Sequence, residues 1–176
     1  MTDTADERMD ERMDVAGFDQ AEDEQAIEML VACCASRRWV DQLIQTRPHR
    51  SLASIIGASD AAVAELDWPD IEQALAAHPR IGERAQGAER ESAWSRQEQS
   101  AAAHPEQTTQ DELRAGNVEY EQRFGHVFLI CATGKSAEDV LAALISRLDN
   151  PAEAEREIVR DELDQIVRLR LAKAFR

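Results

Sequence analysis

The chain has 176 residues, and 35 acidic residues against 20 Lys and Arg give it a formal net charge of −15 at pH 7. This length suits a single domain that buries a real core and can enclose a small-molecule pocket. The strong acidity argues against binding to nucleic acid or to anionic lipid, because both require a basic surface. We therefore expect neither a nucleic-acid partner nor a membrane partner.

The start of the chain and its cysteines favour a cytoplasmic location. Residues 1–14 are polar and acidic, unlike the basic and then apolar start of a signal peptide. No apolar run approaches the roughly 18 residues of a membrane span. Cys33, Cys34 and Cys131 have the spacing of neither a disulfide framework nor a metal-binding pair, and we interpret them as small buried residues. No other cluster has metal-ligand spacing, so no metal site is expected.

Residues 1–17 carry a short acidic repeat with almost nothing apolar to bury, so we expect a disordered tail. Residues 18–176 then form one domain, in which apolar spacing, N-cap residues and prolines predict helices. The expected helices cover residues 22–47, 51–63, 67–78, 92–103, 108–123, 136–148 and 151–174. Residues 127–132 are the one β-like run, which cannot make a sheet alone. The predicted fold is an all-α bundle of about six to eight helices with one short extended segment.

The first candidate for chemistry is His78, which ends a predicted helix next to Pro79. The negative end of a helix dipole favours a protonated imidazole, which would suit a proton donor. An ordinary histidine that stabilises the end of its helix is the alternative, and one histidine does not separate the two readings.

The second candidate is a polar helix face. Ser95, Glu98 and Gln99 follow one another at helical spacing together with Ala102, whose small side chain leaves room for a ligand. A carboxylate on such a face suits acid-base catalysis if water is partly excluded, and Trp94 lies one turn before Glu98. A fully solvated polar face is the alternative.

The third candidate is Arg170 in the last predicted helix. It continues the apolar stripe of Val159, Leu163 and Ile166, so a guanidinium lies in line with the core. A guanidinium in that position needs a carboxylate partner, which either the protein or a substrate can supply. An internal ion pair is the alternative to a binding role, because the chain has 35 acidic residues.

The fourth candidate is the stretch of residues 125–136, which ends in Gly-Lys-Ser. It is not a phosphate-binding loop, because Leu129 stands where that motif needs its first glycine. What remains is an extended backbone whose N–H and C=O groups must find partners. Those partners are either a ligand or the surrounding protein. If the protein supplies them, the stretch is only a buried connector.

Four blocks of the chain, taken together, closely resemble the 2-oxo-4-hydroxy-4-carboxy-5-ureidoimidazoline (OHCU) decarboxylases. The resemblance covers about residues 18–175, with the blocks in the family's order. The blocks are Cys33-Cys34-Ala35-Ser36-Arg37-Arg38-Trp39-Val40, His78-Pro79-Arg80-Ile81-Gly82, Trp94-Ser95-Arg96-Gln97-Glu98-Gln99 and the stretch from Phe124 to Ser136. The resemblance implies an all-helical, cofactor-free and homodimeric enzyme that converts the last intermediate of urate oxidation to (S)-allantoin and CO2.

Carried over by position, the resemblance implies catalytic roles for His78, Glu98 and Arg170. The residues that it implies for binding the ureide substrate are Pro79, Ser95, Gln99 and the run Phe128, Leu129, Ile130, Cys131 and Ala132. Loss of CO2 leaves electrons that the adjacent C=N of the substrate can accept, so the chemistry needs no cofactor. An all-α ureide-binding or protein-interaction module without catalysis is the alternative function.

Overall fold

The computed structural model describes residues 13–81 and 107–175. Within these ranges the chain forms helices linked by turns and irregular segments, without a strand that pairs into a sheet. In chain order the helices are α1 (Val15–Gln20), α2 (Asp23–Cys33), α3 (Arg37–Gln45), α4 (Leu52–Ala64), α5 (Trp68–Leu75), α7 (Gln107–Phe124), α8 (Ala137–Leu148) and α9 (Ala152–Ala174). The expected all-α fold is confirmed. The helix expected over residues 92–103 lies outside the described residues.

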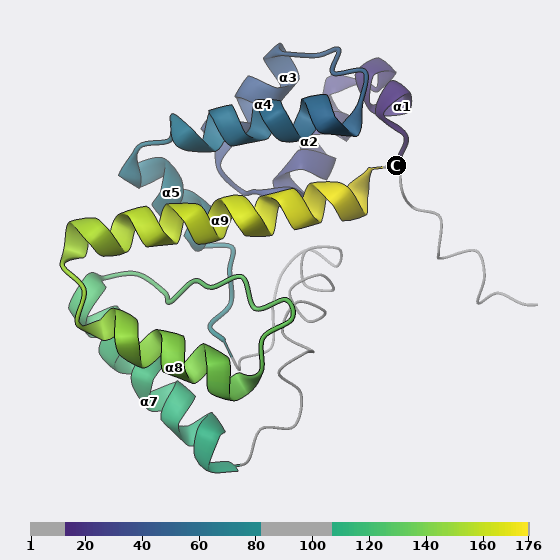
Figure 1. Ribbon diagram of the computed structural model, residues 1–176. Helices are drawn as coiled ribbons and strands as arrows, with labels where there is room; N and C mark the ends of the chain where they lie inside the picture. Colours follow the sequence, from purple (N-terminus) through teal and green to yellow (C-terminus); the bar gives the residue numbers. More distant parts are fainter. Residues whose placement is uncertain (1–12, 82–106, 176) are drawn as a thin grey trace, which may run out of the picture.

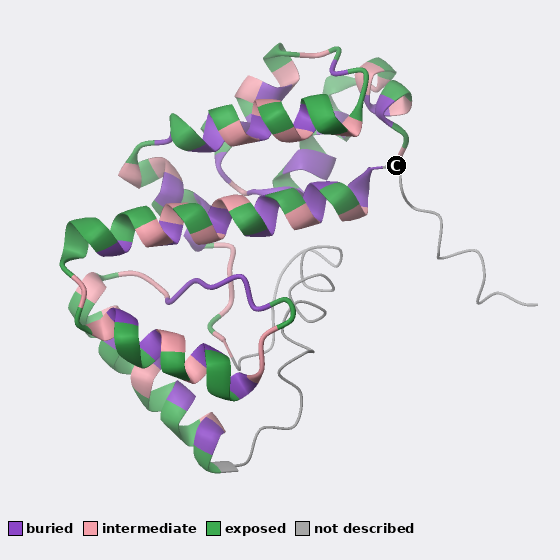
Figure 2. Ribbon diagram, viewed as in Figure 1, coloured by how far each residue is buried: buried purple, intermediate pink, exposed green. Residues whose placement is uncertain are grey.

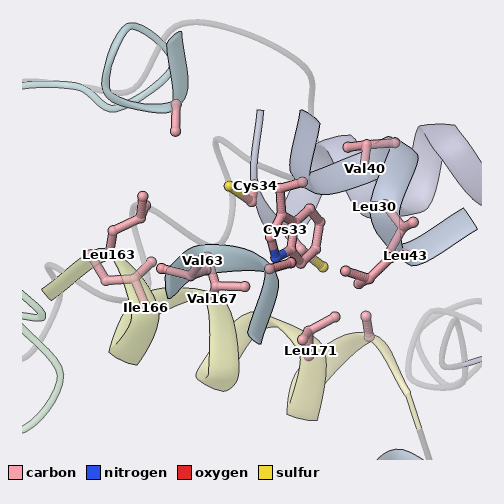
Figure 3. Packing of buried hydrophobic residues seen from close by; sticks show 14 of the residues in the cluster. Leu30, Cys33, Cys34, Val40, Leu43, Val63, Leu163, Ile166, Val167 and Leu171 are labelled. Atoms are coloured by element: carbon pink, nitrogen blue, oxygen red, sulfur yellow. The ribbon is translucent and has the colours of Figure 1, made fainter. Parts of the chain in front are cut away.

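Helix α9 is the longest described helix and separates two groups of helices (Figure 1). On one side α1 to α5 pack together and contact α9 through α2 and α4, and on the other side α7 and α8 form an antiparallel pair. The larger core lies between α9 and the N-terminal helices, and Figure 3 shows Val63 of α4 beside Val167 of α9. The smaller core lies between α7, α8 and the segment that connects them.

The prediction of a single helix over residues 22–47 is wrong, because α2 ends at Cys33 and α3 begins at Arg37. Cys34 has an extended backbone, with φ −152° and ψ 120°. Ser36 then caps α3, since its side chain accepts a hydrogen bond from the Trp39 N–H at 3.4 Å. The apolar spacing continues across the break because both helices bury their apolar faces in the same core.

The described structure begins before the expected domain boundary at residue 18. Asp14 caps α1 by accepting a hydrogen bond from the Gly17 N–H at 2.6 Å. Val15 and Phe18 of this helix are buried, and the Phe18 ring packs edge-on against Phe175 with 5.0 Å between ring centroids. The first helix therefore belongs to the larger core.

The helix starts predicted from local residue patterns are confirmed at α5 and α8. Asp67 and Asp70 form a reciprocal capping box at α5, and Ser136 and Asp139 form the same arrangement at α8. Gly125 follows the end of α7 with φ +79°, a conformation that residues with a side chain adopt rarely. None of the helices in the described ranges has the length and apolar character needed to cross a bilayer.

Candidate active site

The extended run of residues 128–132 lies between the two cores. It belongs to the connection from α7 to α8, which passes between α9 and the α7–α8 pair (Figure 1), and Figure 2 colours its middle as buried. Phe128, Ile130 and Ala132 pack in the smaller core, whereas Leu129 and Cys131 pack in the larger one. This alternation is that of an extended chain, whose successive side chains point to opposite faces. The run can therefore offer a ligand its backbone rather than its side chains.

Two backbone groups of this run are held by charged side chains. The Arg147 Nη1 of α8 donates a hydrogen bond to the Leu129 carbonyl at 2.9 Å. The Cys131 N–H donates to Glu162 Oε2 of α9 at 2.7 Å. For these two groups the interpretation as a buried connector is correct, because the protein itself supplies their partners.

Arg147 is in turn fixed by Glu155, which is fully buried near the start of α9. The Arg147 Nε and Nη2 donate to Glu155 Oε1 at 2.8 and 2.6 Å, and Tyr120 donates its hydroxyl to the same oxygen at 2.5 Å. The guanidinium carbon also lies 4.6 Å from the centroid of the Phe128 ring. Burial, and then the hydrogen bond to Glu155, raise the pKa of Tyr120 well above its ordinary value.

Sequence reasoning missed this network, although the sequence carried a signal for it. Glu155 continues the stripe of Val159 and Leu163 backwards along α9 at helical spacing. Arg147 extends the stripe of Val140 and Leu144 in the same way along α8. A charged residue in line with an apolar stripe was the pattern that indicated Arg170, and it indicates these two residues equally.

His78 lies three residues beyond α5, which ends at Leu75 and not at His78 as expected. Its N–H donates to the Leu75 carbonyl at 2.9 Å, so the chain turns tightly before Pro79. The residue is half-buried, but protein surrounds its imidazole enough that desolvation lowers its pKa from 6.5 to about 3, with the positive charge of Arg170 as the second cause. Desolvation and the charge of Arg170 outweigh the helix dipole, so the imidazole is neutral. The helix dipole alone had predicted a protonated imidazole.

Arg170 is fully buried near the end of α9. The stripe expected from the sequence is confirmed, because Val159, Leu163 and Ile166 are buried on the same helix. Its charge acts on His78, so the fold brings together two of the three residues expected to be catalytic. The third, Glu98, lies outside the described residues, as do Ser95 and Gln99.

Pro79 is half-buried next to His78. Glu162, which holds the extended run, lies two helical turns before Arg170 on α9, so one helix positions both parts of the site. Among the described residues no three His, Cys, Asp or Glu side chains gather in a way that could hold a metal ion.

The lowered pKa of His78 predicts a specific dependence of stability on pH. Below pH 6.5 the unfolded chain binds a proton at His78 that the folded protein does not bind, so folding stability falls as pH falls toward 3. The contribution to the slope is at most about 1.4 kcal/mol per pH unit. Urea unfolding of the wild type and of His78→Asn at several pH values between 4 and 7 measures this difference, and the variant should show the shallower dependence. Coincident slopes would mean that the folded protein protonates His78 normally.

The fold and the site define an all-helical protein in which a neutral histidine, a buried arginine and an extended backbone run are positioned around one long helix. Residues 19–172 match the OHCU decarboxylase family along almost the whole of this domain. The chain belongs to the OHCU decarboxylase family.

Individual relatives agree with this membership. The chain is 34% identical over 147 residues to the uric acid degradation bifunctional protein TTL of Arabidopsis thaliana. The aligned region covers 81% of this chain and 45% of that protein. It therefore spans less than half of that relative's length. It is also 27% identical over 138 residues to the 2-oxo-4-hydroxy-4-carboxy-5-ureidoimidazoline decarboxylase of Haloferax volcanii, with 78% of this chain and 81% of that protein covered.

A solved structure is similar over nearly its whole length. The crystal structure of an OHCU decarboxylase in the presence of (S)-allantoin superposes with a TM-score of 0.72 at 30% sequence identity. The match covers 87% of this chain and 97% of that one. The likeness therefore extends over both groups of helices on either side of α9.

Proposed function

We propose that this protein is a cofactor-free OHCU decarboxylase, which converts 2-oxo-4-hydroxy-4-carboxy-5-ureidoimidazoline to (S)-allantoin and CO2 in urate degradation. The observation that carries the proposal is the match of residues 19–172 to this family, in a fold that buries Arg170 where its charge acts on His78. The names of the relatives support it, because they place those proteins in uric acid degradation or name them as OHCU decarboxylases.

The proposed chemistry divides between the substrate and the protein. When the bond to the carboxylate breaks, CO2 leaves and the electron pair passes to the adjacent C=N of the substrate. The protein then has to orient the substrate, move a proton and deliver it to one face of the ring. We assign the proton transfer at the reacting centre to His78, because its neutral imidazole can accept a proton once an anionic group of the substrate offsets the charge of Arg170, and can later return it.

The remaining roles follow from charge and position. Glu98 is proposed to hold the substrate hydroxyl or His78. Arg170 is proposed to bind an anionic group of the substrate or Glu98, which offsets the repulsion expected from a protein of net charge −15. Pro79, Ser95 and Gln99 are proposed to line the pocket, and the backbone of residues 128–132 to hold the ureide.

A direct assay tests the activity. OHCU is generated in situ from urate by the two upstream enzymes, the protein is added, and allantoin is followed by circular dichroism. Spontaneous decay gives racemic allantoin and little signal, so rapid growth of a chiral signal is the expected result. A signal equal to the control without the protein would contradict the assignment. If (S)-allantoin nevertheless raised the melting temperature, the chain would be a ureide-binding module without catalysis.

We also propose that the protein is a homodimer of the cytoplasm. Val118 of α7 and Ile145 of α8 are large apolar residues with exposed fractions of 54% and 56%, and a second copy could cover them. Light scattering should then give twice the chain mass of 19.7 kDa, and the mass of one chain would contradict the dimer. The three buried cysteines suit a reducing compartment, and cell fractionation tests that location.

A further inference from the structure

We propose that Arg147, Glu155 and Glu162 form a positioning network that fixes the extended run 128–132, so that the backbone edge carrying Ile130 is presented to the ureide. This inference rests on the proposed function, because it names the residues that hold one part of that substrate site. None of the three touches the ligand in this proposal, and each acts through the backbone of the run.

The run needs such a network because it is buried and extended, and the described residues provide no neighbouring strand to pair with it. Buried backbone N–H and C=O groups must find partners, and in a helical protein those partners are side chains or a ligand. Arg147 and Glu162 meet this need at the Leu129 carbonyl and the Cys131 N–H. They come from different helices, α8 and α9, so the run is tied to both helices.

The two ties select one edge of the run. In an extended chain the N–H and C=O of one residue point to one edge, and those of the next residue point to the opposite edge. Leu129 and Cys131 are two residues apart, so their bonded groups share an edge. The N–H and C=O of Ile130 therefore point the other way. One donor and one acceptor side by side match the C=O and N–H groups of a ureide, as one strand matches another.

The network is built for orientation rather than for stability. A buried ion pair contributes little net stability, because desolvating both charges offsets their attraction. Glu155 nevertheless accepts hydrogen bonds from the Arg147 Nε and Nη2, from Tyr120 and, at 2.8 Å, from the Asn150 Nδ2. With its other nitrogens held in this way, the Arg147 Nη1 is directed at the Leu129 carbonyl, and it also lies 4.0 Å from Glu162 Oε1, the carboxylate that holds Cys131.

The network also relates the run to the charged part of the site. Glu162 and Arg170 are separated by about two turns of the same helix, so a rigid element sets the distance between the held backbone and the buried guanidinium. A ligand that spans both parts, such as a ureide with an anionic group, needs that spacing to be constant. Loosening the run should weaken binding without changing the groups that perform proton transfer.

Two variants test the proposal through affinity rather than through stability alone. Arg147→Met removes the tie to Leu129, and Glu162→Ala removes the tie to Cys131 at a side chain that is partly exposed. Each should raise KM and the dissociation constant of (S)-allantoin roughly tenfold or more, while kcat falls less than KM rises. Steady-state kinetics and calorimetry on folded protein measure these constants. Glu162→Gln keeps an oxygen acceptor and should recover most of the affinity lost in Glu162→Ala.

A matched control separates positioning from general loss of structure. Arg160 of α9 also holds backbone carbonyls, since its Nη1 donates to Val63 at 3.0 Å and to Leu66 at 2.6 Å, but these lie at the end of α4. Arg160→Met should lower the melting temperature and leave KM and the allantoin affinity unchanged. If Arg147→Met fails to fold, Glu162→Ala with its Gln rescue decides the outcome.

The results distinguish this inference from the function on which it rests. A wild-type protein that neither turns over OHCU nor binds (S)-allantoin would overturn the proposed function and this inference with it. An active wild type whose folded Arg147→Met or Glu162→Ala variant binds allantoin as tightly would overturn the positioning network alone. The positioning network would also be overturned if Glu162→Gln and Glu162→Ala lost the same amount of affinity for (S)-allantoin, because the hydrogen-bond acceptor would then be irrelevant.

Discussion

Replacing His78 by Ala is expected to reduce kcat/KM for OHCU by about 10²–10⁴-fold, the usual contribution of a positioned acid-base group. Burial and Arg170 lower its pKa to about 3, so the imidazole is neutral at neutral pH. In the proposed mechanism it takes up a proton when an anionic group of the substrate offsets the charge of Arg170. Removing it takes away the proton transfer, and because His78 lies in the turn after α5 and not within a helix, the helices should be kept. The chiral allantoin signal should therefore be lost while the helical circular-dichroism spectrum is retained.

A second histidine provides the control for this experiment. His49 lies in the connection between α3 and α4 and is buried, and its Nε2 lies 2.9 Å from the carbonyl of Leu43 in α3. His49→Ala should lower the melting temperature, because it removes a buried side chain and its hydrogen bond, and leave kcat/KM of the folded protein nearly unchanged. Unchanged turnover in His78→Ala would remove His78 from the mechanism.

Replacing Arg170 by Met is expected to have the second large effect, a loss of at least about tenfold in kcat/KM. Met keeps an unbranched apolar side chain in the buried position but removes the charge that we assign to an anionic partner. The same change should raise the pKa of His78, because one of the two causes that lower it is the positive charge of Arg170. That pKa should stay below 6.5, since burial, the larger cause, remains.

An NMR titration of the imidazole nitrogens measures the shift at His78 independently of turnover. Arg168→Met is the matched control, because this neighbour is half-exposed and pairs with Asp60 and Asp164 at 2.8 and 2.9 Å. Surface pairs of this kind contribute about 1 kcal/mol or less, so the control should keep its activity and the pKa of His78. A folded, fully active Arg170→Met protein with an unshifted His78 would refute both roles of Arg170.

Local sequence patterns predicted the starts of α5 and α8, where the signal lies within one turn. Ser136 and Asp139 form the reciprocal cap that their spacing predicts, and Asp67 is the N-cap residue that its position predicts. The break between α2 and α3 was missed for the opposite reason. Apolar spacing does not report a break in the backbone, and buried residues of α2 and α3 contribute to the same core on both sides of it.

The candidate site could be predicted in part. Helical spacing identified Arg170 as a charged residue in line with the core, and its full burial confirms that position. Spacing did not reveal that Arg147 and Glu155 meet, because they lie on different helices and the pairing depends on how the short turn between α8 and α9 directs the two helices. The charge state of His78 was inferred wrongly from its place after α5, since the desolvation and the cation come from elsewhere in the fold.

The sequence by itself determined the all-α class, most helix positions, the resemblance to one family and the residue types available for the chemistry. These properties follow from local propensity, spacing and capping, which act within a few residues. The tertiary structure alone decided that His78 is neutral and that Arg147 and Glu162 hold the extended run. These properties depend on burial and on charges brought together from distant parts of the chain, and no local pattern encodes them.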